Sequence, residues 1–149
     1  MKIAIGSDHG GFQLKAEIKA YLSEKNIECE DFGTHDLGSC DYPVYGEKVA
    51  EAVASGSFDL GILICGTGLG ISLAANKVKG VRAVCVSDTF SAEMGRAHND
   101  ANILALGERV VGKGLALKIV DAFLNTPFEG DRHLKRVDLI RAIENKNFK

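Results

Sequence analysis

Two short stretches combine glycine with side chains that can move a proton or contact an anion. SDHGG at residues 7–11 carries Asp8 and His9, and CGTGLG at 65–70 begins with Cys65. Carboxylates, imidazoles and thiols are the usual general acids and bases. Glycine lets the backbone approach a ligand closely. These residue types therefore indicate proton-transfer chemistry on a small, charged ligand.

The CGTGLG loop is the most informative of these stretches. It follows an apolar run and opens a segment that we expect to be helical, around 67–79. A helix N-terminus offers free N–H groups to an anion and favours the thiolate of a neighbouring cysteine. Cys65 is therefore a candidate nucleophile or base. The loop is neither the dinucleotide fingerprint, because Gly70 comes one residue too early, nor a P-loop. The alternative is a tight turn that simply needs glycine.

The other ionisable candidates each have a structural alternative. Asp8 and His9 could serve as an acid–base group and a phosphate ligand, but Asp8 could equally cap a helix that begins near Gly10. His98 and Asn99 lie in RAHNDAN, where a helix should end. A histidine at a helix C-terminus is often just a favourable contact with the helix dipole.

A basic pair opens the last predicted helix. Arg132 and Arg136 are i, i+4 neighbours, a spacing that suits a phosphate group, although a solvated basic face has the same pattern. His133 lies between them. We find no cluster with zinc-ligand spacing and no carboxylate set suited to magnesium, so we expect neither a metal nor another cofactor.

Apolar patterning predicts which elements position these residues. Near-continuous apolar runs at 3–5, 60–64 and 83–86 are typical of parallel strands buried on both faces. Stripes with helical spacing lie between them. Alternating strands and helices imply a parallel sheet covered on both faces, with ligands bound at the carboxyl edge of the strands. The expected strands are 2–6, 27–32, 59–64, 81–86 and 102–106, and the expected helices contain 14–22, 45–53, 67–79, 89–98, 115–123 and 132–145, the last capped by Asp131.

Size and composition limit the class of protein. The 149 residues suit one domain, 1–149, and the 46% apolar content excludes a disordered chain. A net charge of −2 gives no basic field for nucleic acid. Apolar runs are too short to cross a membrane. Four cysteines without C-x-x-C pairing suggest reduced thiols in the cytoplasm; for Cys29, Cys40 and Cys85 we favour small buried side chains.

Six motifs in register resemble the type B ribose-5-phosphate isomerases over nearly the whole chain. They are SDHGG, DYP, CGTGLGIS, AHNDANIL, GER and RHLKRV, beginning at residues 7, 41, 65, 97, 107 and 132. The wider family includes galactose-6-phosphate isomerase subunits and allose-6-phosphate isomerases. The resemblance implies a Rossmann-like three-layer α/β/α sandwich with about five parallel strands and a C-terminal helix. It also implies that the protein interconverts ribose 5-phosphate and ribulose 5-phosphate without a cofactor.

The resemblance also implies roles for individual residues. Cys65 matches the base, and Leu69 stands where cysteine-lacking relatives have a glutamate. His98 matches the group that opens the sugar ring, with Asp8 assisting. The remaining matches are Thr67 and the amides of Gly66, Gly68, Leu69 and Gly70 for the enediolate, His9, Arg109, Arg132 and Arg136 for phosphate, and Tyr42 and Asn99 for the sugar.

The resemblance further implies a homodimer, in some relatives paired into a tetramer, with active sites shared between subunits. A hexose 6-phosphate isomerase is the alternative within enzymes. A non-catalytic flavodoxin-like phosphate-binding module is the alternative outside them, because Asp8 and Asp88 both follow strands.

Overall fold

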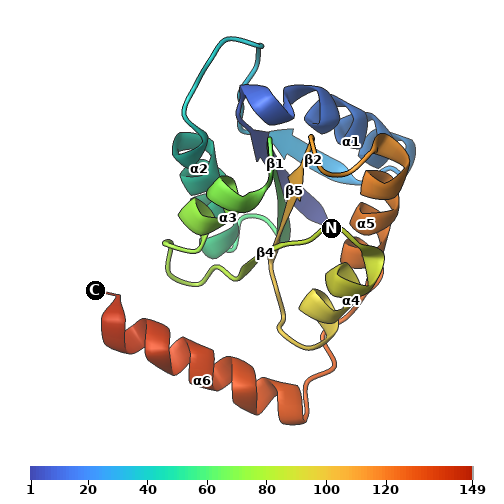
Figure 1. Cartoon of the computed structure of the whole chain (residues 1–149). Coiled ribbons are helices and arrows are strands. Elements are labelled where there is room, and N and C mark those ends of the chain that lie inside the picture. Colours follow the sequence, from blue (N-terminus) through green and yellow to red (C-terminus); the bar gives the residue numbers. More distant parts are fainter. Residues whose placement is uncertain (149) are drawn as a thin grey trace.

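The five predicted apolar runs form one parallel sheet. The computed structural model describes residues 1–148, and its strands lie in the order β2-β1-β3-β5-β4 (Figure 1). The chain therefore reverses its winding direction beside β1, and the carboxyl ends of all strands share one edge. The strands are β1 Lys2–Ser7, β2 Glu28–Asp31, β3 Leu60–Cys65, β4 Ala83–Cys85 and β5 Ile103–Gly107.

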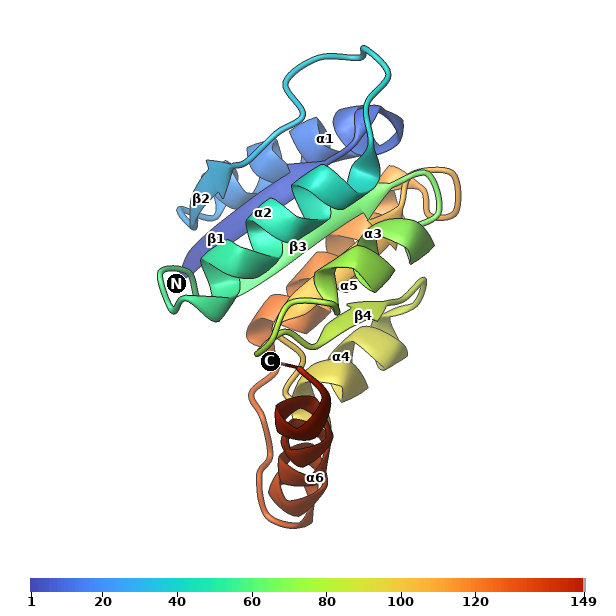
Figure 2. The same cartoon turned by 90° about the vertical axis from the view of Figure 1, so that its left-hand side faces the viewer.

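Helices cover both faces of the sheet, which confirms the predicted three-layer α/β/α sandwich. Apolar side chains of α1, α4 and α5 pack on one face, and those of α2 and α3 pack on the other (Figure 2). A short 3-10 turn, η1, joins β1 to α1. The helical elements are η1 His9–Gly11, α1 Phe12–Glu24, α2 Tyr42–Ala54, α3 Leu69–Ala75, α4 Thr89–Ala97, α5 Lys113–Asn125 and α6 Arg132–Asn147.

Strand position decides how deeply each apolar run is buried. Every residue of β3 and β5 is buried, as their sequences predict. The prediction for 83–86 was wrong, because β4 is a three-residue edge strand whose residues are only half-buried. The expectation that three of the thiols are buried was also wrong, because none of them lies at the centre of the sheet. Cys29 and Cys85 lie on edge strands and Cys40 in a loop, all half-buried, and all four cysteines are free.

The last helix, α6, projects from the rest of the molecule (Figures 1 and 2). Its side chains of Leu139, Ile140 and Ile143 are exposed. Asp131 occupies the position before the helix, but its side chain makes no capping bond, because its backbone there has φ of 49° and ψ of −126° rather than the extended conformation of a capping residue. Within residues 1–148, no helix combines the length and apolarity that crossing a bilayer requires.

A buried lysine fixes the turn after β2 against the end of β1. Lys15 is 1% exposed, and its Nζ lies 2.8 Å from Asp31 Oδ1 and also donates to the Thr34 carbonyl. The same turn pairs with the backbone of Ser7, whose N–H donates to Gly33 O at 2.7 Å. The Lys15–Asp31 pair therefore supports the strand end that carries Asp8.

The Asp31 carboxylate should stabilise the fold in a pH-dependent way. Its partial burial opposes ionisation, but bonds from Lys15, Lys19 and the Gly33 N–H outweigh this and lower its pKa. The carboxylate therefore contributes stability above its unfolded pKa of about 3.8, and this is lost as the pH falls through the lower folded value.

We expect Asp31→Asn to lower the free energy of unfolding by about 3 kcal/mol at pH 7, because it leaves the buried Lys15 ammonium without its carboxylate partner. The difference in this free energy between the variant and the unaltered protein should shrink below about pH 3.8, as measured by denaturant unfolding followed by circular dichroism. Glu30→Gln, at an exposed position of the same strand, should have little effect. A pH-independent loss would contradict the role of the charge.

Candidate active site

A pocket of about 290 Å³ opens at the carboxyl edge of the sheet. It lies where β1 and β3 end, on the two sides of the point at which the winding reverses. Loops after three strands and the first turn of α2 contribute to it. The lining residues are Asp8, Tyr42, Cys65, Gly66, Thr67, Gly70 and Arg109, all of which the sequence singled out.

Cys65 is the buried thiol of this pocket. It is 4% exposed, and the Gly68 N–H donates to its Sγ at 3.1 Å. Gly68 has a φ of +81°, which the glycine permits without strain and which turns its N–H toward the sulfur. The loop is thus both a glycine-requiring turn and a polar environment for sulfur.

Two of the five loop amides are already engaged. The Gly68 N–H is taken by Cys65 Sγ, and the Leu69 N–H donates to Thr67 Oγ1 at 3.2 Å. Of the amides from 66 to 70 that were predicted to face a ligand, only those of Gly66, Thr67 and Gly70 are therefore free of a bond within the loop.

Asp8 and His9 both have structural partners. Asp8 is 7% exposed, and its Oδ1 accepts the Gly10 N–H at 2.9 Å, so the capping alternative is confirmed. Its side chain nevertheless also lines the Cys65 pocket. His9 Nδ1 accepts the Cys40 N–H at 3.2 Å, which ties the loop before α2 to the end of β1. The His9 ring is therefore held against the loop before α2, and it is not among the residues that line the pocket.

The loop after β5 holds the Cys65 loop in place. The N–H groups of Glu108 and Arg109 donate to the carbonyls of Cys65 and Gly66 at 2.9 and 3.0 Å. A Cβ on Gly107 would lie 2.5 Å from the Thr67 carbonyl oxygen. Only glycine allows this approach of two backbones.

We expect Gly107→Ala to destabilise the fold by roughly 1–3 kcal/mol and to lower catalytic turnover, because it must push the Thr67 backbone away. Gly114→Ala is the matched control, since a Cβ there meets nothing within 4 Å. Thermal melts and turnover of both variants test this. Equal effects of the two substitutions would show that the close approach does not matter.

The second group of candidate residues surrounds the C-terminus of α4 and the start of α6. The rings of His98 and His133 stack with centroids 4.1 Å apart. Burial, the nearby His98 and Arg132 lower the pKa of His133, and Glu129 partly opposes this. The Arg136 guanidinium also contributes to the field at His133, so it belongs to this group.

One chain does not bring the two groups together. Asp8, His9, Cys65 and its loop lie at the carboxyl edge of the sheet, whereas His98 and Asn99 follow α4 and precede β5, at the opposite end of the strands. Figures 1 and 2 both show α6 projecting from that opposite end. Within one chain the predicted sugar and phosphate contacts therefore divide into two separate half-sites.

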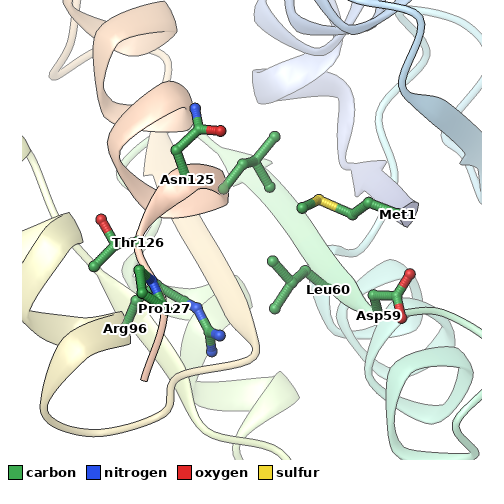
Figure 3. Close-up of a pocket in the computed structure, with 8 residues that line it drawn as sticks. Met1, Asp59, Leu60, Arg96, Asn125, Thr126 and Pro127 are labelled. Atoms are coloured by element: carbon green, nitrogen blue, oxygen red, sulfur yellow. The ribbon is translucent and has the colours of Figure 1, made fainter. Parts of the chain in front are cut away.

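A larger cavity elsewhere contains none of the predicted residues. It has a volume of about 710 Å³ and lies between the starts of β1 and β3 and the end of α5 (Figure 3). Its lining includes Met1, Leu60 and Pro127, with Arg96 as its one cation. Arg96 is already bonded to Asp100 Oδ1 at 3.0 Å and to the Ala101 carbonyl. The chemistry-bearing residues thus favour the smaller pocket.

Sequence reasoning missed two residues that organise these sites. Glu108 Oε1 accepts the Leu14 N–H at 2.6 Å and so joins the β5 loop to α1. Glu129 approaches both His98 and His133. The i, i+4 spacing of Glu129 and His133 could have drawn attention to Glu129. That spacing becomes meaningful only in the structure, where His98 lies beside His133.

The fold and the pocket define an α/β protein that presents a thiol, a carboxylate and backbone amides to a ligand at a sheet edge. The chain belongs to the ribose/galactose isomerase family, whose sequence model matches residues 3–140.

Individual relatives are similar over their full lengths. Ribose-5-phosphate isomerase B of Escherichia coli K12 is 56% identical over 145 residues, which cover 97% of each chain. The solved ribose-5-phosphate isomerase B of Clostridium thermocellum is 61% identical with a TM-score of 0.97, over 98% of this chain and 99% of that one. The enzyme from Mycoplasma genitalium, solved with bound ribulose 5-phosphate, is 44% identical with a TM-score of 0.94, over 98% and 97%.

Proposed function

We propose that this protein interconverts ribose 5-phosphate and ribulose 5-phosphate by proton transfer through an enediolate. The observation that carries the proposal is Cys65, buried at the carboxyl edge with an amide bond to its sulfur and Asp8 in the same pocket. Family membership and the close relatives named for this activity support the substrate.

In this mechanism Cys65 is the base. Its thiolate takes the proton from C2 of the open-chain aldose and returns it to C1. The hydroxyl proton on O2 passes to O1 in the enediolate, so the carbonyl moves from C1 to C2. Charge develops on the carbonyl oxygen during the transfer. We assign that oxyanion to Thr67 and the amides of Gly66 and Gly70, since the neighbouring amides already donate within the loop. One such preorganised donor is typically worth about 3–4 kcal/mol of barrier.

Ring opening must precede this step, because an aldopentose 5-phosphate in solution is mainly a cyclic furanose. We assign the proton transfer at the ring oxygen to His98, assisted by Asp8, and sugar contacts to Tyr42 and Asn99. The Tyr42 ring lies against the loop, since a Cβ on Gly70 would be 2.6 Å from Tyr42 Cζ. This contact supports a role for Tyr42 as a wall of the pocket.

We propose that the active unit is a homodimer in which the half-site around His98 meets the Cys65 pocket of a second copy. The separation of the two half-sites in one chain supports this. So do the exposed apolar side chains of α6, because apolar stripes of this kind are usually covered. Two such dimers could pair into a tetramer. We propose a single domain, 1–149, working in the cytoplasm.

In this dimer the phosphate would contact His9, Arg109, Arg132 and Arg136. We expect Arg136→Ala to raise KM for ribose 5-phosphate at least tenfold with a smaller change in kcat, because the phosphate positions the sugar but does not react. Steady-state kinetics measure this, with Lys135→Ala, the adjacent exposed cation, as control. An unchanged KM for Arg136→Ala would remove it from the phosphate site.

The assay that tests the function compares three substrates. Turnover on ribose 5-phosphate should exceed that on galactose 6-phosphate and allose 6-phosphate, with no loss on adding a chelator. Faster turnover on a hexose 6-phosphate would assign the chain to that branch of the family. The non-catalytic phosphate-binding alternative predicts no exchange of solvent deuterium into any of these sugars.

A further inference from the structure

A histidine, a glutamate and a second histidine converge at the junction of α4 and α6. Glu129 Oε1 lies 3.4 Å from His133 Nε2 and 3.9 Å from His98 Nε2. All three potential ligand atoms lie within 4.8 Å of one another. Two imidazole nitrogens and one carboxylate oxygen are ligands that zinc and similar ions use.

The Glu129–His133 spacing already suits a tetrahedral site, whereas His98 has to move to complete it. Ligand atoms about 2.0–2.1 Å from a zinc ion are separated by roughly 3.3 Å in tetrahedral geometry. The Glu129–His133 distance of 3.4 Å already matches, and the Glu129–His98 distance of 3.9 Å must close by more than half an ångström. Because the two rings are stacked 4.1 Å apart, the exposed His98 ring must turn toward the carboxylate.

His133 gives an independent reason to expect a ligand. Its side chain is 6% exposed, yet its Nε2 has no hydrogen-bond partner, since the contact with Glu129 does not meet hydrogen-bond geometry. Buried polar nitrogens are rarely left without a partner. The unpaired nitrogen faces the Glu129 carboxylate, on the side where an ion would bind.

The local backbone holds the ligands together. The Glu129 N–H donates to the Ala97 carbonyl at 3.0 Å, next to His98, which closes α4. His133 lies in the first turn of α6, four residues after Glu129. All three side chains therefore come from one junction of the same chain.

We propose that His98, Glu129 and His133 form a binding site for one divalent transition-metal ion, such as Zn²⁺ or Co²⁺. Three protein ligands leave a fourth position open, which a water molecule or an anion can take. Arg132 and Arg136 lie near His133 and disfavour a cation. We therefore expect micromolar rather than tighter affinity.

Titration of the intact protein with Co²⁺, followed by visible absorption, tests the site. One ion per chain should bind, with ligand-field bands but without the thiolate charge-transfer band that the free cysteines would give. Glu129→Ala should weaken binding at least tenfold. Glu129 is half exposed, so this variant should fold normally even if His133→Gln does not. His35→Gln, on an exposed loop, should bind as the unaltered protein does.

Unchanged affinity in Glu129→Ala, or a thiolate band, would overturn the proposal by placing the ion elsewhere. A further consequence rests on the proposed function: a metal that holds His98 should inhibit ring opening, and Glu129→Ala should resist that inhibition. Binding at this site without inhibition would support the metal site and count against the role of His98.

Discussion

Replacing Cys65 with alanine is expected to lower kcat by at least about a thousandfold, because it removes the group that we propose as the base moving the proton between C2 and C1. Substrate affinity should change little, since phosphate contacts supply most of the binding. Stopped assays of isomerisation and calorimetry with ribose 5-phosphate measure the two quantities separately. Retained turnover would exclude Cys65 as the base.

Cys85→Ala is the matched control for this experiment. Cys85 lies on the other side of the same loop, where a Cβ on Gly68 would come within 2.9 Å of its sulfur. Burial raises the pKa of the Cys85 thiol, so it is protonated near neutral pH. We expect its removal to cost no more than a few-fold in turnover, which would show that losing a thiol near the loop does not by itself stop catalysis.

Mixing two inactive variants should restore activity. Cys65→Ala damages the half-site at the carboxyl edge, and His98→Ala damages the other. If each active site takes one half-site from each subunit, a mixed dimer holds one intact site. Random reassociation should then recover about a quarter of the unaltered activity. Co-expression with two affinity tags, followed by isolation of the mixed dimer, is the direct measurement.

The control pair is Cys65→Ala with Asp8→Asn. Both residues line the same pocket of one chain, so every site of that mixed dimer carries one defect. We expect no recovery there. Recovery in both mixtures, or in neither, would contradict sites shared in this way.

Much of the fold could be predicted from local patterning. The strands at 60–64 and 102–106 sit at the centre of the sheet, where continuous apolar runs are required, so sequence and structure agree. Patterning could not distinguish the 83–86 run from these, because an edge position depends on strand order. Strand order in turn depends on packing between distant helices.

The pocket was predictable to the extent that its residues follow strands. Asp8 and Arg109 follow strands and Cys65 ends one, and a parallel sheet places all three at one edge. His98 could not be placed in this way, because it precedes a strand. The roles of Gly68 and Gly107 were also only partly visible. Both are glycines in loops, but the sulfur contact of one and the backbone contact of the other depend on three-dimensional neighbours.

The division of the candidate residues between opposite ends of one chain has an evolutionary consequence. Selection can act on each end separately. After gene duplication, one copy can lose the Cys65 end and the other the His98 end, and on the shared-site proposal the pair still forms one complete site. Neither copy would then be dispensable. A self-sufficient homodimer of this design can thus become an obligate pair of unlike subunits without gaining a new catalytic residue.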